Sequence, residues 1–246
     1  MRERKNAMQP YPDRLVKTAG IEIPLIGFYD APDPAPFAPV VEPRAGTRVC
    51  VFAFYKNWLK GETLRVTKDN FGCGGAGRSW CGVEERSREE FIHFLVDEEG
   101  LKASRELMSR WIDSNAPYRQ KHPNILVGPL RETQYEFLKT VTFFVNPDQL
   151  GLMTLGAQYE SAPEDAPPVI SPFGSGCMQL VGVFKDLGAP QAAIGGTDMA
   201  MRQYLPPDIL AFTVTKSMYE RLASLDERSF LSKPFWKRLM KARKKG

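Results

Sequence analysis

The sequence is poor in the residue types from which most catalytic and metal sites are built. It has two His and four Cys in 246 residues, and it contains neither a CxxC pair nor an HExxH segment. A structural zinc site normally draws on closely spaced ligand pairs, so the spacing gives such a site no support. No segment has the spacing of a Walker phosphate loop, and no Ser/His/Asp order or paired-carboxylate motif stands out.

Long apolar runs are absent as well. No window approaches the roughly 18 apolar residues of a membrane span, and no apolar run of signal-peptide length follows the charged N-terminus. We therefore expect a soluble, cytoplasmic protein. In that compartment cysteines are thiols or ligands more often than disulfides.

Excess positive charge is confined to one end of the chain. The formal net charge is +4, but residues 233–246 hold seven Lys or Arg and no acid, so the rest carries −3. A nucleic-acid-binding protein normally spreads a basic face over its fold. We expect a solvated C-terminal helix, and nucleic acid is not an expected partner apart from weak contact of this tail with RNA or anionic lipid.

The remaining composition is that of an ordinary globular protein. Hydrophobic residues make up 43% and charged residues 25% of the chain, so a chain of this length can build a core without disulfides. We expect three parts: residues 1–46 are an N-terminal segment with a Pro-rich connector, residues 47–226 are the main domain, and residues 227–246 are the basic tail.

Apolar patterns predict both strands and helices. Residues 47–55 (TRVCVFAFY) are apolar on both faces, which favours a buried strand. Residues 87–96 open with Ser87 three residues before Glu90, the signature of a helix-capping box. Residues 101–112 carry apolar residues at helical spacing.

One pattern occurs twice in the C-terminal half. In each copy two short apolar strands lead into a helix, and the copies occupy residues 124–159 and 192–225. This suggests a duplicated strand–strand–helix unit. The expected fold is therefore α+β, with a mixed or antiparallel sheet and helices packed on it.

Two glycine-flanked cysteines are the best candidates for a functional site. They lie in FGCGGAGRSWCG (71–82) and SPFGSGCMQL (171–180). Glycines let backbone N–H groups approach a ligand, and a thiol at the start of a helix has a stabilised thiolate. Asp198, a short polar residue at the end of a predicted strand, is a further candidate. The candidate cofactor-binding residues are Cys73, Gly74, Gly75, Gly174, Gly176, Cys177 and Asp198.

Several chemistries remain open for these cysteines. Cys73 and Cys177 are candidate metal ligands: zinc would need Cys81 and a group such as His122 in addition, and an iron–sulfur cluster would need further ligands. A redox dithiol, a single reactive thiolate and purely structural cysteines are alternatives. Asp198 is either a pocket residue or a turn cap. Arg202 and Tyr204, just beyond it, are candidates for binding an anion or a ring.

A set of segments in a fixed order resembles a known family. They are the stretch with Cys50, FGCGGAG around Cys73, NILVGPL (124–130), VTFFVNPDQLGLM (141–153), PFGSGCMQL (172–180) and IGGTDMAMRQYLPPDILAFTV (194–214). Over about residues 49–225 they resemble the archaeal and bacterial domain of unknown function 169, DUF169. The resemblance implies no activity. It implies that Cys73 and Cys177 are the family's recurring cysteines, whereas Cys81 stands where a hydrophobic residue is more usual.

The two glycine-flanked cysteines favour a cofactor- or metal-associated protein that has a redox or ligand-binding function. Its pocket would be lined by Cys73, Cys177 and the glycine-rich loops. The cofactor stays open, with an iron–sulfur cluster or another metal as candidates. The alternatives are a small-molecule binding module without catalysis and a structural protein with inert core cysteines.

Overall fold

The computed structural model describes residues 11–47, 49–71, 79, 81–83, 87–115, 118–162, 164–174 and 176–243. The strands that it describes form one eight-stranded mixed sheet, which together with the helices confirms the α+β prediction. The strands are β1 (Ile26–Ala31), β2 (Val40–Val41), β3 (Thr63–Val66), β4 (Asn124–Pro129), β5 (Leu138–Val145), β6 (Val169–Ile170), β7 (Ala192–Gly195) and β8 (Leu210–Thr215).

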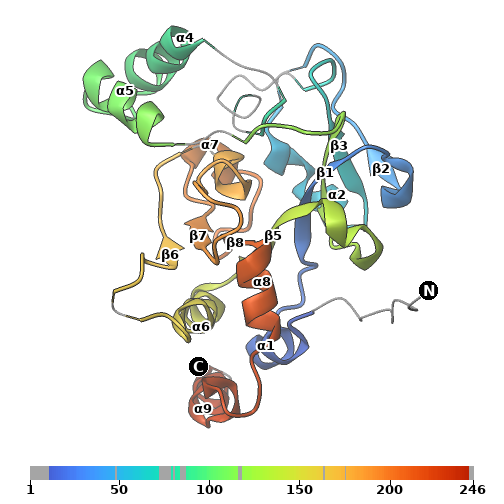
Figure 1. Ribbon diagram of the computed structural model, residues 1–246, viewed down its shortest axis with the longest axis vertical. Helices are drawn as coiled ribbons and strands as arrows, with labels where there is room; N and C mark the ends of the chain where they lie inside the picture. The colour runs from blue at the N-terminus through green and yellow to red at the C-terminus, as the bar shows by residue number, and fades with distance from the viewer. Residues whose placement is uncertain are drawn as a thin grey trace, which may run out of the picture.

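Helices and helical turns cover both faces of this sheet (Figure 1). The helices are α1 (Asp13–Ala19), α2 (Tyr55–Leu59), α4 (Arg88–Ile92), α5 (Arg105–Ser114), α6 (Pro147–Gln158), α7 (Met199–Arg202), α8 (Lys216–Ala223) and α9 (Phe235–Arg243). The 3-10 turns are η1 (Ala35–Phe37), η2 (Val51–Phe54), η4 (Glu132–Phe137), η5 (Met178–Leu180) and η6 (Phe230–Ser232), and the π-helix η3 (His93–Glu98) continues α4. The pair α4 and α5 and the helix α9 lie at opposite ends of the long axis (Figure 1). No described helix combines the length and apolar character needed to cross a membrane.

The core is divided between the two faces of the sheet. On the helix face, α1, α6 and α8 pack on side chains such as Tyr29, Val141 and Phe212. On the turn face, η2, α2, η5 and α7 pack on side chains such as Phe28 and Phe144. The central strands are therefore buried on both sides, which explains why β5 reads LKTVTFFV rather than as a strict alternation.

The predicted strand over residues 47–55 is wrong. Residues 51–59 form the 3-10 turn η2 and the short helix α2 instead. Val51, Phe52 and Trp58 from this segment are buried on the turn face. A short apolar run cannot distinguish a buried strand from a buried helical turn, because periodicity needs at least one polar side.

The two halves of the sheet repeat one topology. The strand order is β2-β3-β4-β1-β5-β8-β7-β6, so each half has its first strand at the centre, followed outward by its fourth, third and second strands. In both halves the outermost pair is parallel and the other pairs are antiparallel. Since β1 and β5 are also antiparallel neighbours, the halves are related by an approximate two-fold axis perpendicular to the sheet.

The strand register extends this repeat to the sequence. Val40 pairs with Thr63, and Val169 pairs with Ala192, so equivalent residues differ by 129 in number. At that spacing residues 39–69 align with residues 168–198 without a gap, and VFAFYKNW (51–58) matches LVGVFKDL (180–187) in apolar, small and polar positions. Five aligned pairs are identical: Pro39 and Pro168, Val40 and Val169, Pro43 and Pro172, Lys56 and Lys185, Asp69 and Asp198.

The repeat predicted from the sequence has a different pairing. In residues 124–159 the strands β4 and β5 are separated by β1, whereas β7 and β8 of residues 192–225 pair directly. The topological repeat instead relates β1–β4 to β5–β8. Its main asymmetry is the link between third and fourth strands, with 57 residues between Val66 and Asn124 but 14 between Gly195 and Leu210.

The close approach of β3 to β4 requires a glycine at position 128 in β4. A Cβ atom there would lie 2.7 Å from the Cα atom of Thr63 on β3, a backbone position that cannot give way. We expect Gly128→Ala to lower the free energy of unfolding by about 1–3 kcal/mol. Gly151→Ala is the control, because Gly151 lies inside α6 with open space around it. It should raise stability by about 0.5–1 kcal/mol, and urea denaturation of both variants measures the contrast.

Candidate functional site

Two glycine-containing turns meet on the turn face of the second half. One runs from Gly174 to η5 and contains Cys177; the other follows β7 and contains Gly196 and Asp198. They are joined by the buried amide of Gln179. Its Oε1 accepts from Gly196 N at 2.7 Å, and its Nε2 donates to Thr197 Oγ1 at 3.0 Å. A buried polar side chain that is hydrogen-bonded on both ends fixes the relative position of the two turns.

Asp198 forms a second link between these turns. Its Oδ1 accepts from Ala200 N at 2.9 Å and so caps α7, while its Oδ2 accepts from Gly176 N at 2.9 Å. The sequence suggested that Gly176 offers its N–H to a ligand. In the structure the Asp198 carboxylate accepts from that N–H, so this donor is not available to an anionic ligand.

The glycines of these turns are explained by packing. A Cβ atom on Gly176 would lie 2.1 Å from Met201 Sδ, and one on Gly195 would lie 2.7 Å from Gln179 Oε1. Gly174 has a φ of +154° and faces Met178. A side chain at Gly176 or Gly195 would push apart segments that the two turns bring together, and one at Gly174 would clash within its own turn. Close contact between the turns therefore accounts for their glycine content.

Three cysteines from separate segments reach the same apolar cluster on the turn face. Cys81 and Cys177 are both buried in it, and Cys50 packs against it from its edge. Cys81 Sγ lies 3.9 Å from the carbonyl oxygen of Cys177, within hydrogen-bonding reach of sulfur. Cys73, Gly74 and Gly75 lie outside the described residues. Phe71, just before that loop in the sequence, is buried in the same cluster as Cys81.

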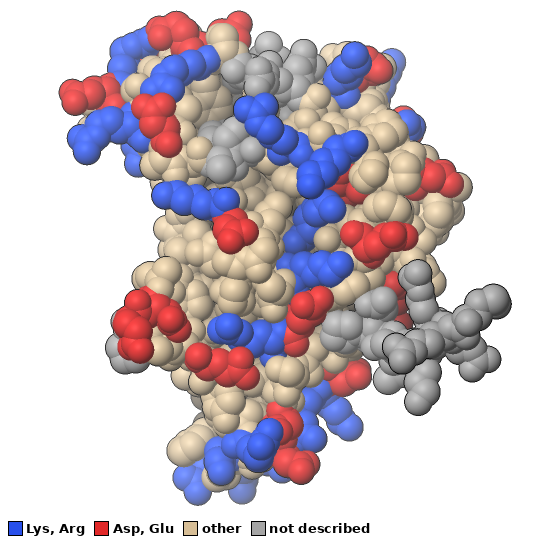
Figure 2. Space-filling model, viewed as in Figure 1, with Lys and Arg blue, Asp and Glu red and all other residues tan. Residues whose placement is uncertain are grey.

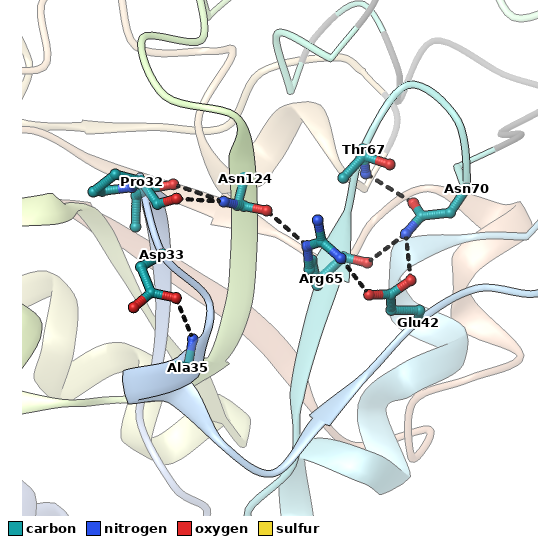
Figure 3. Close-up of polar contacts among 9 residues, drawn as sticks. Pro32, Asp33, Ala35, Glu42, Arg65, Thr67, Asn70 and Asn124 are labelled. Atoms are coloured by element: carbon teal, nitrogen blue, oxygen red, sulfur yellow. Dashed lines mark hydrogen bonds and ion pairs between the residues drawn. The ribbon is translucent and has the colours of Figure 1, made fainter.

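A polar network holds the chain where it leaves β3 toward the glycine-rich loop (Figure 3). Arg65 Nη1 lies 2.6 Å from Glu42 Oε1, and Arg65 Nε donates to Asn124 Oδ1 at 2.6 Å. Asn70 Nδ2 donates to Glu42 Oε2 at 3.1 Å, and Asn70 Oδ1 accepts from Thr67 N at 2.8 Å. The Arg65 guanidinium lowers the pKa of Glu42 by hydrogen bonding to its carboxylate. These contacts fix the strand end from which the loop departs.

The glycine-rich loop also has the spacing G-x-G-x-x-G, in GCGGAG at residues 72–77. In a dinucleotide-binding fold this motif links a strand through a helix to a parallel strand. Here β3 pairs antiparallel with β4, the next strand along the chain. The topology therefore gives no support to dinucleotide binding.

The long β3–β4 connection crosses from the first half to cover the second-half turns. Phe91, Leu95 and Met108 of this connection share a buried cluster with Met178 and Ala193 of the second half. The same connection carries Glu99. Partial burial raises the pKa of the Glu99 carboxyl, and the negative charges of Asp198 and Glu98 raise it further. Asp198 therefore lies at the Cys177 turn and acts electrostatically on Glu99.

The other candidates named from the sequence have structural partners. Arg202 donates to four backbone carbonyls and so stabilises the loop that follows α7. The acceptors are the carbonyls of Gly196, Pro206, Pro207 and Ile209. His122 packs edge-on against Phe137, with ring centroids 5.6 Å apart. Within the described ranges no group of three or more His, Cys, Asp or Glu side chains could hold a metal ion. The described members of the predicted zinc set, Cys81, Cys177 and His122, therefore form no such group.

Sequence reasoning missed two residues of this region. Gln179 has a detectable signal, because it is a single amide inside the apolar stretch CMQLV, and a buried amide requires partners. Glu99 has none, since its proximity to Asp198 arises only from the path of the β3–β4 connection.

Replacing Gln179 tests the link between the two turns. Gln179→Met keeps the length of the side chain but leaves the buried N–H of Gly196 without its acceptor. We expect a loss of about 1–3 kcal/mol in the free energy of unfolding, together with faster reaction of Cys177 with a thiol reagent. Thr197→Val removes only one hydrogen bond and should cost about 1 kcal/mol. Equal losses in both variants would contradict a central role for Gln179.

The carboxylate pair predicts a specific pH dependence. The folded protein raises the pKa of Glu99, so ionised Glu99 destabilises the fold, fully above its folded pKa and not at all below its unfolded pKa. Glu99→Gln should therefore raise the melting temperature at pH 7, and the gain should vanish as the pH falls through that window. The exposed Glu22→Gln is the charge-matched control. A gain for Glu99→Gln that is independent of pH would refute the assignment.

Comparison with known proteins identifies the family of this chain. Residues 15–224 match the model of the DUF169 family, described as "Uncharacterised ArCR". No curated protein and no solved structure matches the chain. Because the family match covers most of the length and includes both turns of the site, the chain belongs to the DUF169 family.

Proposed function

We propose that the protein binds a small molecule at the Cys177 turn, with Cys73 and Cys177 lining the site. The observation that carries the proposal is the convergence of cysteine-bearing segments. Cys50, Cys81 and Cys177 come from three parts of the chain and share one cluster. Cys73 belongs to the loop between Phe71 and Cys81, two members of that cluster.

The asymmetry of the repeat supports this location. Both halves have the same strand order, yet the connection that packs over the second-half turns has 57 residues where its counterpart has 14. Loops placed on a rigid scaffold are the usual carriers of binding function. The elaborated side of the molecule is therefore the favoured side for a ligand.

The charges near the turn favour one ligand class. Gly176 N and Gly196 N already have internal acceptors, so these donors are not offered to an anion. Glu99 and Asp198 instead supply negative charge. An organic ligand with a cationic or hydrogen-bond-donating group would relieve the repulsion between the carboxylates, while its apolar part would lie against the thiols.

The decisive experiment examines protein purified without oxygen. Native mass spectrometry would detect a bound organic molecule, and absorption, metal and sulfide analysis of the same sample would detect a cluster. We expect an organic ligand that is lost in Cys73→Ala and Cys177→Ala but kept in Cys50→Ala, the matched control at the edge of the same cluster. Stoichiometric iron and sulfide that are lost in the same two variants would show that these thiols bind an iron–sulfur cluster and not an organic ligand. A protein without ligand or metal, or one that keeps its ligand in both variants, would overturn the proposal.

A further inference from the structure

The C-terminal helix α9 lies at the end of the molecule away from α4 and α5, beyond α1 and α6 (Figure 1). Arg243, at its end, forms an ion pair with Asp148 near the start of α6, with Nε and Oδ2 2.7 Å apart. Phe230, shortly before α9, contacts the ring of Tyr159, directly after α6. These two contacts tie α9 and the turn before it to α6, and Trp236 packs α9 onto the helix-face core.

Large apolar side chains remain exposed around this contact. The exposed fractions are 70% for Phe235 and 36% for Met240 on α9, and 55% for Leu155 and 47% for Tyr159 at the end of α6. Asp148, Leu155 and Tyr159 are spaced by seven and four residues, which places them on one stripe of the helix. We call these four apolar residues, together with the cations of residues 233–241 described next, the C-terminal face.

Four cations of the C-terminal face form no ion pair with an acid in the part of the chain that the structure describes. None of the ion pairs in the described ranges includes Lys233, Lys237, Arg238 or Lys241, whose side chains are exposed. Four acids of the helix-face elements pair with arginines instead: Glu160 with Arg221, Glu227 with Arg14, Asp226 with Arg228 and Asp148 with Arg243. Figure 2 shows Lys and Arg side chains at the lower end of the molecule, where α9 lies in the same view of Figure 1, with some Asp and Glu side chains among them.

We propose that the C-terminal face binds the surface of an anionic lipid bilayer. A helix of nine residues is about 14 Å long and cannot span a bilayer, but it can lie in the interface. Lysines and arginines are attracted to anionic headgroups, and bulky apolar side chains such as Phe235 enter the boundary with the acyl chains. A nucleic acid backbone would satisfy the cations alone and leave the apolar side chains in water, so the combination favours lipid.

The test is co-sedimentation of the full chain with vesicles. We expect binding to vesicles of equal parts phosphatidylglycerol and phosphatidylcholine, and none to pure phosphatidylcholine. Each cation contributes about 1 kcal/mol, or about fivefold in affinity, so Lys237→Glu with Lys241→Glu should reduce binding at least about 25-fold. Phe235→Ser should weaken it without changing its salt dependence. Raising the ionic strength from about 0.1 M to about 1 M should weaken the wild type, because the Debye length falls from about 10 to about 3 Å.

Matched controls separate this surface from general charge and apolar effects. Lys56→Glu with Lys60→Glu makes the same charge change on exposed positions of the α2 segment, and Leu101→Ser removes an exposed apolar side chain from the β3–β4 connection. Both should bind like the wild type. Equal binding to pure phosphatidylcholine, unchanged binding of the charge-reversed α9 variant, or displacement from vesicles by a stoichiometric single-stranded oligonucleotide would overturn the lipid proposal.

Discussion

The pairing of β1 with β5 joins the two halves of the sheet, and the layers on both faces depend on it. Its centre is the pair Gly27 and Val141, with Ile26 opposite Thr142 and Phe28 opposite Thr140. On either side the halves repeat the same order and the same pairing senses. The joint sheet lets α6 and α8 of the second half and α1 of the first share one core, and it brings η2 and η5 onto one opposite face. Neither half alone would bury its central strand.

Much of the second half of the fold could be predicted from the sequence because its connections are short. The predicted strands and helices correspond to β4, β5, α6, β7, β8 and α8 within a few residues, since Asn146 and Pro147 mark a helix start and apolar runs mark the strands. The elements of the first half are harder to predict from the sequence. The apolar run 51–55 fits a strand as well as it fits the turn η2 and the start of α2, which it forms. The two-fold repeat becomes evident only from strand pairing, because only five residues are identical between residues 39–69 and 168–198.

The candidate site shows the same division between local and long-range information. Glycine-flanked Cys177 and the capping role of Asp198 are readable from neighbouring residues. Their link through Gly176 N joins residues 22 apart, and the Cys81–Cys177 contact joins residues 96 apart. Such contacts have no local signature. They also change the chemical interpretation, because the turn that resembles an anion nest in sequence is filled by the protein's own carboxylate.

The unequal β3–β4 and β7–β8 links have a thermodynamic consequence. The entropy of closing a flexible loop depends on the logarithm of its length, so a link of 57 rather than 14 residues costs only about 1 kcal/mol more to close. Packing of α4 and α5 against the second half adds favourable burial to offset this cost. An insertion at this point therefore leaves the register of the sheet intact. The end of β3 is the place where a chain of this topology can change in length with the smallest loss of stability. A change in length there would also change what the protein recognises.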